Sequence, residues 1–528
     1  MTAPRVATTP TTDLVSAVLT RGAEQPRRLA IRDSRGRSVT YGDLADGIAS
    51  VAAHLSASDL AVGDGVLLAL RPSPRAVMAA LGVVLAGGVV VVADPGAGEA
   101  LLDVRRRTVP VAAAVADTVV HAATRPPFST LIARLPATSG LQLPDLSTPG
   151  LLHVVSGPRL PGVPASATRW ESLPRGPFAP TELPPSRDAL VVFTSGSTAA
   201  PRAVVHTVAS LSAGVQAAVE ALHLGGEVVL HTDQLMLGLP ALVGGAVWSL
   251  PSVTASTAAW VRQARRERAT HAYAVPAKLL DAASRGLPPT LRTVATGGAP
   301  VLPATVRRLS ALAPGVEVRA VYGLTEALPV AVATGEEVLS SPPDRTVLGH
   351  PLPGVRVRID RADASGVGEI VVRAPQARHR IAGHAADTEV HTGDLGELAA
   401  DGSLLLAGRA KNMIIRGQTN IYPELVEPLL LERHGTRLRD CALVGLTDPV
   451  SGDERVVLAV VPVPGASHAD ARAVAREVHR SWAQLADESW RPDDVLVVDT
   501  VPRRGRSNAV DLEALHELVA RAPRAARA

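Results

Sequence analysis

The chain has 528 residues, more than one hydrophobic core usually supports, so its length predicts several subdomains. Hydrophobic residues make up 46% of the chain and aromatic residues only 2%, which predicts a large core built mainly from aliphatic side chains. The net charge of +3 is small and scattered, and it does not favour a nucleic-acid partner.

The N-terminal part predicts alternating helices and strands. Apolar residues at helical spacing predict a helix over 40–55, with Thr40 as its N-cap, and a strand follows over 66–70. The uncharged run 76–93 is just long enough for a membrane span, but Gly87-Gly88 divides it into a helix, a turn and a buried strand. This order predicts an α/β domain with a largely parallel sheet and no membrane span.

The middle of the chain begins with residues 125–187, which are rich in Pro, Ser and Gly and weakly periodic. We expect irregular surface structure there. The alternation then resumes, and short hairpins follow it. The expected elements are strands over 228–230, 272–275 and 294–296, a helix over 260–266, and hairpins at 366–373 and 402–407.

The C-terminal part changes to the pattern of a small α+β unit from residue 412 onward. We therefore expect a boundary near Lys411, with domains covering residues 1–410 and 411–528. The expected elements of the smaller domain are helices near 422–433 and 470–485 and strands over 441–445, 456–463 and 495–498.

Rare residue types add two expectations. The single Cys441 excludes an intrachain disulfide, and the N-terminus lacks the apolar segment of a signal peptide, so a cytoplasmic location is predicted. Lys278 and Lys411 are the only lysines, and Arg supplies all the other cationic side chains apart from His.

A loop of small hydroxyl residues follows the apolar run that ends at Phe193. After a buried strand, such a loop can offer hydroxyl and backbone N–H groups to phosphate oxygens, with an arginine as a nearby cation. It lacks the spacing of a Walker A loop, and an ordinary Ser/Thr/Gly turn is the alternative. The candidate phosphate loop comprises Thr194, Ser195, Gly196, Ser197, Thr198 and Arg202.

This loop resembles the phosphate loop of the adenylate-forming superfamily, T-S-G-[ST]-T-G-x-P-K-G, to which acyl-CoA synthetases, peptide-synthetase adenylation domains and luciferases belong. Ala199 and Ala203 replace the second and third glycines, and Arg202 replaces the lysine. Further motifs follow in the order of that superfamily from about residue 40 to residue 515. The resemblance implies an α/β fold with a large N-terminal domain of α/β subdomains, a β-barrel-like subdomain and a small mobile α+β C-terminal domain.

Tyr322-Gly323-Leu324-Thr325-Glu326 resembles the Y-G-x-T-E element of that superfamily. The resemblance implies that the tyrosine ring stacks on adenine and that Thr325 and Gly323 lie beside the AMP. It also implies that Thr325 donates to the α-phosphate and that Glu326 is a catalytic residue able to hold Mg²⁺. A plain turn after a strand is the alternative interpretation.

Gly297-Gly298-Ala299-Pro300 resembles the segment whose backbone lines the adenine and the acyl carbon. Glycines allow a flat ligand to approach the main chain closely. A tight turn after the strand over 294–296 is the alternative, and only the position of the segment favours binding.

His391-Thr392-Gly393-Asp394 resembles the family T-G-D, in which the carboxylate accepts hydrogen bonds from the ribose hydroxyls. Arg409 is implied to reach the ribose as well, and Lys411 is implied to lie at the hinge between the two domains. Without this context, Arg409 and Lys411 would be read as a solvated pair on a linker.

The stretch 413–427 resembles the loop that lines the pantetheine path once the adenylate has formed. Gly417, Asn420 and Glu427 fit the family pattern, whereas Gln418 stands where glycine is usual. A side chain at this tunnel wall could narrow the path of the thiol. The implied CoA tunnel therefore comprises Gly417, Gln418 and Asn420.

The last motif lies near the C-terminus, where family members carry a catalytic lysine before a V-D or I-D pair. Aligning Val510-Asp511 with that pair places Ala509 at the lysine position. The lysine bridges the carboxylate and the α-phosphate during adenylation, so this cation would be missing. A competing alignment on Gly505 lets Arg506 take the lysine's place. An engineered lysine-to-alanine change would look the same.

The candidate acyl pocket includes Gly297 and a stretch where many relatives carry an aromatic residue and a histidine. Leu235 and Met236 stand there and predict an apolar, adaptable wall for a bulky hydrophobic acid. Plain core packing is the alternative for Met236.

The departures from the family pattern cluster at the pyrophosphate loop and at Ala509, whereas the implied AMP contacts are intact. The sequence therefore predicts an acyl-CoA ligase that turns a preformed acyl adenylate and CoA into a thioester, with Mg²⁺ as a dispensable cofactor. This motif state resembles the non-adenylating ligases of platensimycin and platencin biosynthesis, so a separate adenylating ligase is expected as a partner. The alternatives are a complete synthetase in which Arg202 and Arg506 replace lysines, and an inactive adenylate-binding scaffold. The thiol could be CoA or a carrier protein.

Overall fold

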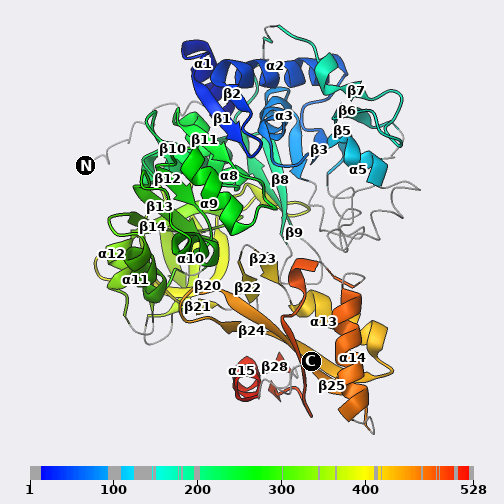
Figure 1. Ribbon diagram of the computed structural model, residues 1–528, viewed down its shortest axis with the longest axis vertical. Helices are drawn as coiled ribbons and strands as arrows, with labels where there is room; N and C mark the ends of the chain where they lie inside the picture. The colour runs from blue at the N-terminus through cyan, green and yellow to red at the C-terminus, as the bar shows by residue number, and fades with distance from the viewer. Residues whose placement is uncertain are drawn as a thin grey trace.

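A large N-terminal domain and a smaller C-terminal domain make up the computed structural model (Figure 1). Their strands form separate sheets within the part of the chain that the structure describes. That part comprises residues 13–92, 109–123, 146, 150–176, 178–179, 182–194, 202–299, 301–342, 345–362, 366–409, 414–417, 419–421, 423–464, 468–482, 485–486, 488–504 and 509–522.

The first sheet has eight strands in the order β19-β9-β8-β4-β3-β5-β6-β7. Its centre is parallel, and β8 and β9 form an antiparallel pair at one side. Helices α2 (Tyr41–Ala57), α3 (Pro74–Leu85) and α5 (Thr118–Ala123) belong to the same part of the chain. The strands are β3 (Gly65–Ala69), β4 (Val89–Val92), β5 (Val111–Asp117), β6 (Leu152–Ser156), β7 (Thr168–Arg169), β8 (Asp188–Thr194), β9 (Arg202–Thr207) and β19 (Arg380–Ile381).

Local sequence explains the start of this region. Thr40 caps α2 through a reciprocal bond with Asp43, as the predicted N-cap requires. The uncharged run 76–93 separates into α3 and β4, joined by a turn in which Gly87 has φ +89°. This confirms the predicted helix, turn and strand. Among the described residues, no helix is both long and apolar enough to cross a membrane.

The expectation of irregular structure over 125–187 is wrong for part of that region. β6 is a buried strand that pairs in parallel with β5, and β7 and the 3₁₀ turn Trp170–Ser172 follow it. The strand is five residues long and lies between Gly150 and Gly157. Its apolar residues are too few to give a periodic signal against Pro- and Gly-rich flanks, so only pairing with β5 reveals it.

The second sheet has thirteen strands in the order β17-β18-β20-β21-β16-β15-β14-β13-β12-β10-β11-β1-β2. From β1 to β14 along this order the pairs are parallel, and from β14 to β17 they are antiparallel. The antiparallel end lies where a β-barrel-like subdomain is expected, and it continues the parallel sheet. The strands are β1 (Leu29–Asp33), β2 (Ser38–Thr40), β10 (Val229–His231), β11 (Val247–Leu250), β12 (His271–Tyr273), β13 (Thr293–Gly297), β14 (Glu317–Leu324), β15 (Ala327–Thr334), β16 (Thr346–Pro351), β17 (Arg356–Asp360), β18 (Gly368–Arg373), β20 (Val390–Leu398) and β21 (Leu404–Arg409).

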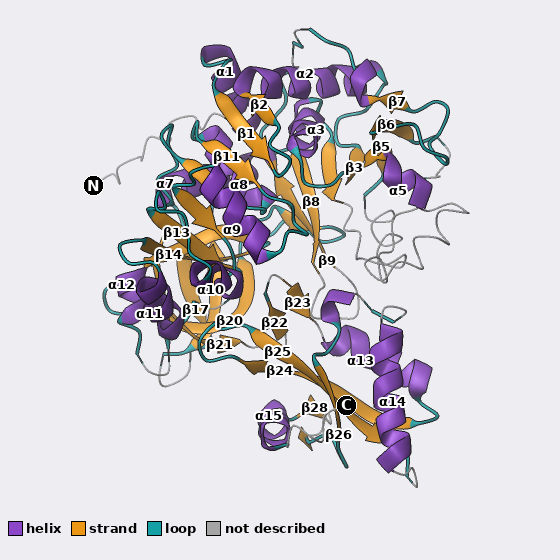
Figure 2. Ribbon diagram, in the orientation of Figure 1, coloured by secondary structure: helices purple, strands orange, loops and turns teal. Residues whose placement is uncertain are grey.

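Helices flank this sheet, as Figure 2 shows for α8, α9, α10 and α11. Fully buried Trp248 and Trp260 anchor two of the hydrophobic clusters beneath them. The helices are α1 (Leu14–Glu24), α7 (Val208–Ala221), α8 (Leu235–Val243), α9 (Thr257–Arg266), α10 (Pro276–Ser284), α11 (Pro303–Leu312) and α12 (Gly335–Leu339).

The smaller domain is built on the three-stranded sheet β24-β25-β26, with a two-stranded hairpin on each side. This matches the predicted α+β pattern of helices and strands. The elements are β22 (Ile414–Arg416), β23 (Thr419–Ile421), α13 (Pro423–His434), β24 (Leu438–Thr447), β25 (Glu454–Pro462), α14 (His468–Ser481), a 3₁₀ turn (Glu488–Trp490), β26 (Asp494–Val497), β27 (Arg503–Arg504), β28 (Ala509–Val510) and α15 (Leu512–Arg521).

The two faces of this sheet have separate cores, because successive strand residues point to opposite sides. Leu443 packs in a cluster with Ile414 of β22 and Trp482, which follows α14. Val444 packs in a second cluster with Leu515 of α15. The hairpins β22–β23 and β27–β28 therefore lie on opposite faces of the small sheet.

The loop between β24 and β25 contacts the large domain. The Thr305 hydroxyl of α11 donates a hydrogen bond to the Val450 carbonyl oxygen. The Val450 side chain also packs against the hydrophobic cluster that contains Val306 and Leu309. Asp453, in the same loop, accepts a hydrogen bond from the backbone N–H of Gly417. We call this loop, residues 448–453, the docking loop. It joins the β22–β23 side of the small domain to the large domain.

Candidate functional site

The Y-G-x-T-E element forms a two-residue hairpin turn. Thr325 and Glu326 occupy the turn between β14 and β15, where Leu324 pairs with Ala327. The His206 ring lies 2.8 Å from the Thr325 carbonyl oxygen through its Nε2. The backbone N–H of Arg378 donates to the Glu326 carbonyl oxygen over 2.6 Å. The turn is therefore fixed from the strand that follows the phosphate loop.

His206 supports this turn as a neutral imidazole. It is 6% exposed, and burial lowers its pKa, although the bond to Thr325 acts in the opposite direction and the charge of Arg378 lowers it further. A neutral ring can donate one N–H, and the bond to the Thr325 carbonyl accounts for Nε2. Sequence reasoning missed this residue, because nothing in the sequence shows that β9 reaches the β14–β15 turn.

Tyr322 and Asp394 come together, although 72 residues separate them. The Tyr322 hydroxyl donates to Asp394 Oδ2 over 2.9 Å, and Asp394 is only 7% exposed. The Asp394 N–H donates to the Thr392 hydroxyl oxygen over 3.1 Å, and that hydroxyl donates to the Ile370 carbonyl. The two predicted nucleotide motifs thus meet in one place, with a carboxylate held at a fixed position.

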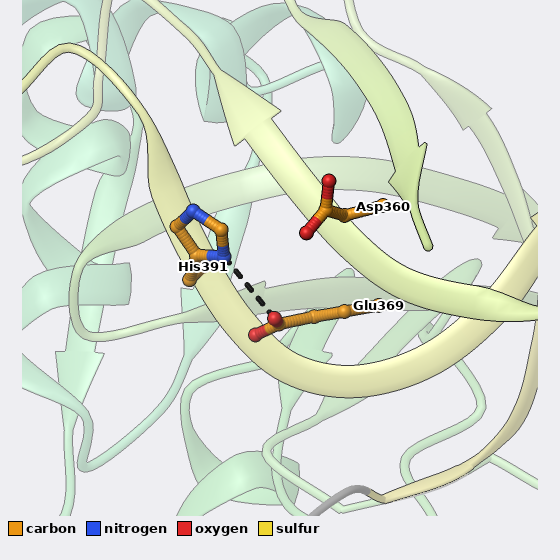
Figure 3. Close-up of side chains that lie close together, drawn as sticks. All are labelled: Asp360, Glu369 and His391. Carbon is orange, nitrogen blue, oxygen red and sulfur yellow. Dashed lines mark hydrogen bonds and ion pairs between the residues drawn. The ribbon is translucent and has the colours of Figure 1, made fainter. Parts of the chain in front are cut away.

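Glu369 supports the T-G-D segment from β18. It accepts hydrogen bonds from the Gly393 N–H at 3.0 Å and from His391 Nδ1 at 3.1 Å (Figure 3). Asp360, Glu369 and His391 each place one potential metal ligand within 4.8 Å of the others. Arg358 already pairs with Asp360 at 2.7 Å, so this cluster is best described as support for the Asp394 loop.

The phosphate loop joins the ends of β8 and β9, where Thr194 pairs with Arg202 in the strand register. Val191 of β8 is buried, as a loop after a buried strand requires. Arg380 of β19 holds the start of β8 through two hydrogen bonds to Asp188, at 2.6 and 3.1 Å. Residues 195–201 of the predicted loop, and the side chains of Thr194 and Arg202, lie outside the described residues.

Gly297 is the last residue of β13 and Gly298 follows it, and both lie close to the buried Tyr273. A Cβ at Gly297 would lie 2.3 Å from the Val321 carbonyl oxygen, and one at Gly298 would adopt φ +77°. Both positions face Tyr273, whose hydroxyl would lie 3.4 and 3.8 Å from the two Cβ atoms. Burial raises the pKa of Tyr273, with a further contribution from Asp233. Ala299 follows the pair, and Pro300 lies outside the described residues.

The predicted acyl pocket has charged neighbours that sequence reasoning missed. Leu235 and Met236 begin α8 and are 36% and 39% exposed, so neither packs in the core. Asp233 precedes them and pairs with Lys278 of α10 at 2.5 Å. Both partners follow the carboxyl end of a parallel strand, which is where ligands bind in such sheets. The rarity of lysine in the chain was the one signal available.

A buried, neutral histidine and a tryptophan lie close to this pair. His231 is fully buried, and burial with the nearby charge of Lys278 lowers its pKa to about 3. Its ring packs edge-on against Trp260 at 4.3 Å, and the Lys278 ammonium lies 5.7 Å from the centroid of the same indole.

Three further predicted residues lie near the large domain's C-terminal end and in the first small hairpin. Arg409 pairs with Asp394 in the register of β20 and β21, so the two predicted ribose residues are neighbours on adjacent strands. Gly417 has φ +59° in the turn of β22–β23. Asn420 lies opposite Ile415 in that hairpin. Gln418 and Lys411 lie outside the described residues, as do the side chains of Arg409 and Asn420.

Ala509 lies in the second small hairpin. It pairs with Arg504, and Val510 pairs with Arg503. Asp511 caps α15 by accepting from the Ala514 N–H. Arg503 anchors the hairpin to Asp440 of β24 at 2.6 Å. The Val510-Asp511 frame on which the alignment depends is therefore a strand end followed by a helix cap, while residues 505–508, including Arg506, lie outside the described residues.

Comparisons with known proteins find similar sequences and structures over most of the chain. The amide bond synthetase McbA of Marinactinospora thermotolerans has a similar structure, with a TM-score of 0.76 and 27% identity over 96% of this chain and 99% of that one. The medium/long-chain-fatty-acid–[acyl-carrier-protein] ligase FadD10 of Mycobacterium tuberculosis is 26% identical over 93% of this chain and 92% of its own length.

A third relative matches a shorter part of the chain. The 2-succinylbenzoate–CoA ligase of Lactococcus lactis is 28% identical over 291 residues, which is 53% of this chain and 62% of that protein. The family model described as AMP-binding enzyme matches residues 19–379, a range that contains the phosphate loop, the glycine pair and the β14–β15 turn. The chain therefore belongs to the AMP-binding enzyme family.

Proposed function

We propose that this protein is an acyl-CoA ligase specialised for the second half-reaction, in which an acyl adenylate and CoA give acyl-CoA and AMP. The thiol sulfur attacks the carbonyl carbon of the mixed anhydride, the bond from that carbon to the phosphate oxygen breaks, and AMP leaves with the electron pair. The thiol proton passes to solvent. This step needs a bound AMP group and an open path for the thiol, but no pyrophosphate site.

The observation that carries this proposal is the position of the two small hairpins. The docking loop that contacts Thr305 also holds Gly417, so β22–β23 lies on the side of the small domain that faces the large one (Figure 1). β28, which contains Ala509, lies on the opposite face together with α15. This arrangement supports thiol delivery, because the hairpin predicted to line the thiol path is the one on the side of the small domain that faces the large domain.

The nucleotide contacts support the same reaction. The Tyr322 hydroxyl donates to the Asp394 carboxylate and the Thr392 hydroxyl accepts from the Asp394 N–H, so the carboxylate can accept ribose hydroxyls without reorganising. Thr325 is fixed at a hairpin turn through its carbonyl oxygen, which leaves the side-chain hydroxyl for the α-phosphate. In this proposal these groups hold AMP while the acyl carbon is exposed to the thiol.

The sequence departures argue against efficient adenylation. During adenylation the carboxylate and the α-phosphate approach each other, and removing one positioned electrostatic contact of this kind typically costs about 10²-fold in rate. Ala509 carries no charge, and Ala199 and Ala203 add side chains in the pyrophosphate cradle.

Glu326 could hold Mg²⁺ together with phosphate oxygens, which suits an ion usually bound by one or two carboxylates. Bound there, Mg²⁺ would neutralise phosphate charge.

The acceptor and the partners are part of the proposal. The three relatives are described as a CoA ligase, an acyl-carrier-protein ligase and an amide bond synthetase. Gly417 and Asn420 keep the pattern of the loop that lines a pantetheine arm, which CoA and carrier proteins share. We take CoA as the acceptor because the Lactococcus lactis relative is described as a CoA ligase. A separate adenylating ligase would supply the adenylate of a bulky hydrophobic acid, a division of labour that fits a secondary-metabolite pathway.

The test separates the two half-reactions. Synthetic adenylates of a panel of hydrophobic acids are mixed with CoA and the protein, and acyl-CoA and AMP are quantified by mass spectrometry. The exchange of labelled pyrophosphate into ATP is measured with the same free acids. We expect acyl-CoA formation and little exchange. Robust exchange would establish a complete synthetase instead, and adenylate binding without transfer would establish a scaffold.

A further inference from the structure

Asp233 and Lys278 form an ion pair at the acyl side of the site. The Lys278 ammonium contacts Asp233 Oδ2 at 2.5 Å, and it lies beside the indole of Trp260. Asp233 follows β10 and Lys278 stands in the first turn of α10, which follows β12. β10 and β12 are adjacent and parallel, so the two residues come from the same edge of the sheet.

Tyr273 links this pair to the segment predicted to hold the acyl carbon. Tyr273 ends β12, and its hydroxyl lies beneath Gly297 and Gly298 at the end of β13. Asp233 is close enough to Tyr273 for its charge to contribute to the raised pKa of the phenol. Leu235 and Met236, two and three residues beyond Asp233, are the exposed apolar residues of the predicted wall.

Lys278 is the more exposed member of the pair. The Asp233 side chain is 4% exposed, whereas that of Lys278 is 18% exposed. A lysine ammonium has three N–H donors, and among the described residues its hydrogen bond is the one to Asp233. The remaining donors can therefore bind a substituent of the acyl chain, and an anion would gain charge-assisted hydrogen bonds there.

A purely structural role explains this placement poorly. Burying an ion pair costs desolvation energy, and such pairs are often no more stabilising than apolar residues of similar volume. α10 has an apolar stripe, and Leu279 and Leu280 next to Lys278 are buried. Nothing in the packing of the helix requires a cation at this position, whereas specificity for a charged ligand does require one.

We propose that Lys278, held by Asp233, binds an anionic group at the distal end of the acyl chain, so that the substrate is an acid with an apolar body and a second carboxylate or comparable anion. This inference rests on the proposed function, because it assigns the acyl site of the same adenylate. It adds a charged end to the apolar wall formed by Leu235 and Met236.

The test uses stable adenylate mimics whose binding does not depend on catalysis. Acyl sulfamoyl adenosines are prepared in matched pairs, from straight-chain monoacids and from diacids of 4 to about 12 carbons, with ω-amino acids as a third series. Dissociation constants are measured by calorimetry. At the preferred length we expect the diacid mimic to bind about tenfold or more tightly than the monoacid mimic, as one charge-assisted contact predicts.

Two variants and a control assign the effect to the pair. Lys278→Met should abolish the diacid preference, and Asp233→Asn/Lys278→Met should do the same without leaving a buried charge unpaired. Arg285→Met removes a half-exposed ion pair with Asp281 at the end of the same helix and should keep the preference. Thermal unfolding establishes that each variant is folded.

The outcomes decide the inference and distinguish it from the proposed function. Equal binding of all three series, a preference for ω-amino acyl mimics, or a diacid preference that survives both Lys278 variants would overturn the distal-anion inference while leaving adenylate binding intact. If no mimic binds and no acyl-CoA forms from the adenylates of bulky hydrophobic acids, the proposed function is overturned, and the inference with it. If no mimic binds but acyl-CoA does form from those adenylates, the inference alone is overturned.

Discussion

The two short hairpins of the small domain differ in their surroundings, because they lie on opposite faces of its sheet. β22–β23 contains Gly417 and is tied to the loop that docks on α11. β27–β28 contains Ala509 and is tied by Arg503 to the far face of β24. One sheet separates them, so only one of them can face the predicted AMP site in a given arrangement of the two domains. We therefore expect a change at Ala509 to act in another arrangement of the two domains, in which β27–β28 faces the large domain.

The largest effect is expected at Gly417, which lies in the hairpin that faces the large domain. Gly417→Val places a β-branched side chain at φ +59°, where such residues are strained, and on the proposed thiol path. We expect CoA-dependent transfer to fall about 100-fold, as misplacement at a reaction path typically does. Adenylate binding should change little, and both are measured with synthetic adenylate.

The matched control for this variant is Gly402→Val. Gly402 has φ +85° in the exposed turn between β20 and β21, and a Cβ would meet nothing within 4 Å at either glycine. Backbone strain is therefore similar in the two variants, but only Gly417 lies on the proposed path. Equal losses in both would mean that β22–β23 has no special role in transfer.

A gain of activity is expected from the opposite hairpin. Ala509→Lys should raise acid-dependent pyrophosphate release about tenfold, less than the full ~10²-fold value of one electrostatic contact, because the phosphate loop keeps its altered residues. CoA transfer should stay unchanged, since β28 faces away in that arrangement. If release stays at background while transfer persists, Ala509 is not the lysine position or the phosphate loop alone limits adenylation.

Tyr322 tests the region that serves both half-reactions. Tyr322→Phe removes the hydroxyl that donates to Asp394 at 2.9 Å, and a hydrogen bond to a charged group is worth roughly 1.5–3 kcal/mol. We expect adenylate affinity to fall about tenfold at most, because water can replace part of the contact. Transfer and the small residual exchange should fall by the same factor. A loss confined to one of them would contradict a shared nucleotide site.

The smallest effect is expected at the domain contact. Thr305→Val keeps the shape of the side chain but removes the hydrogen bond to the Val450 carbonyl. A net contribution of about 0.5–1.5 kcal/mol predicts a fall of roughly threefold in CoA transfer, with adenylate affinity unchanged. Stopped-flow measurement of acyl-CoA formation checks it, and an unchanged rate would show that this contact does not favour the transfer arrangement.

Local patterns in the sequence were sufficient for much of the fold. The Thr40 cap, the division of 76–93 at Gly87-Gly88 and the alternation of strands and helices after residue 228 depend on neighbouring residues, and the structure bears them out. The short strand β6 was not predictable, because five residues between Pro- and Gly-rich flanks carry no periodic signal until β5 is beside them.

The candidate site shows the same division between local and distant information. The sequence by itself determined the motifs that contain Tyr322, Thr325 and Asp394, because each is a short contiguous pattern. Only the tertiary structure decided that Tyr322 donates to Asp394 and that His206 holds Thr325, since 72 and 119 residues separate the partners. The ion pair between Asp233 and Lys278 could likewise not be predicted from the sequence. The two residues meet only because two parallel strands end at the same edge of the sheet.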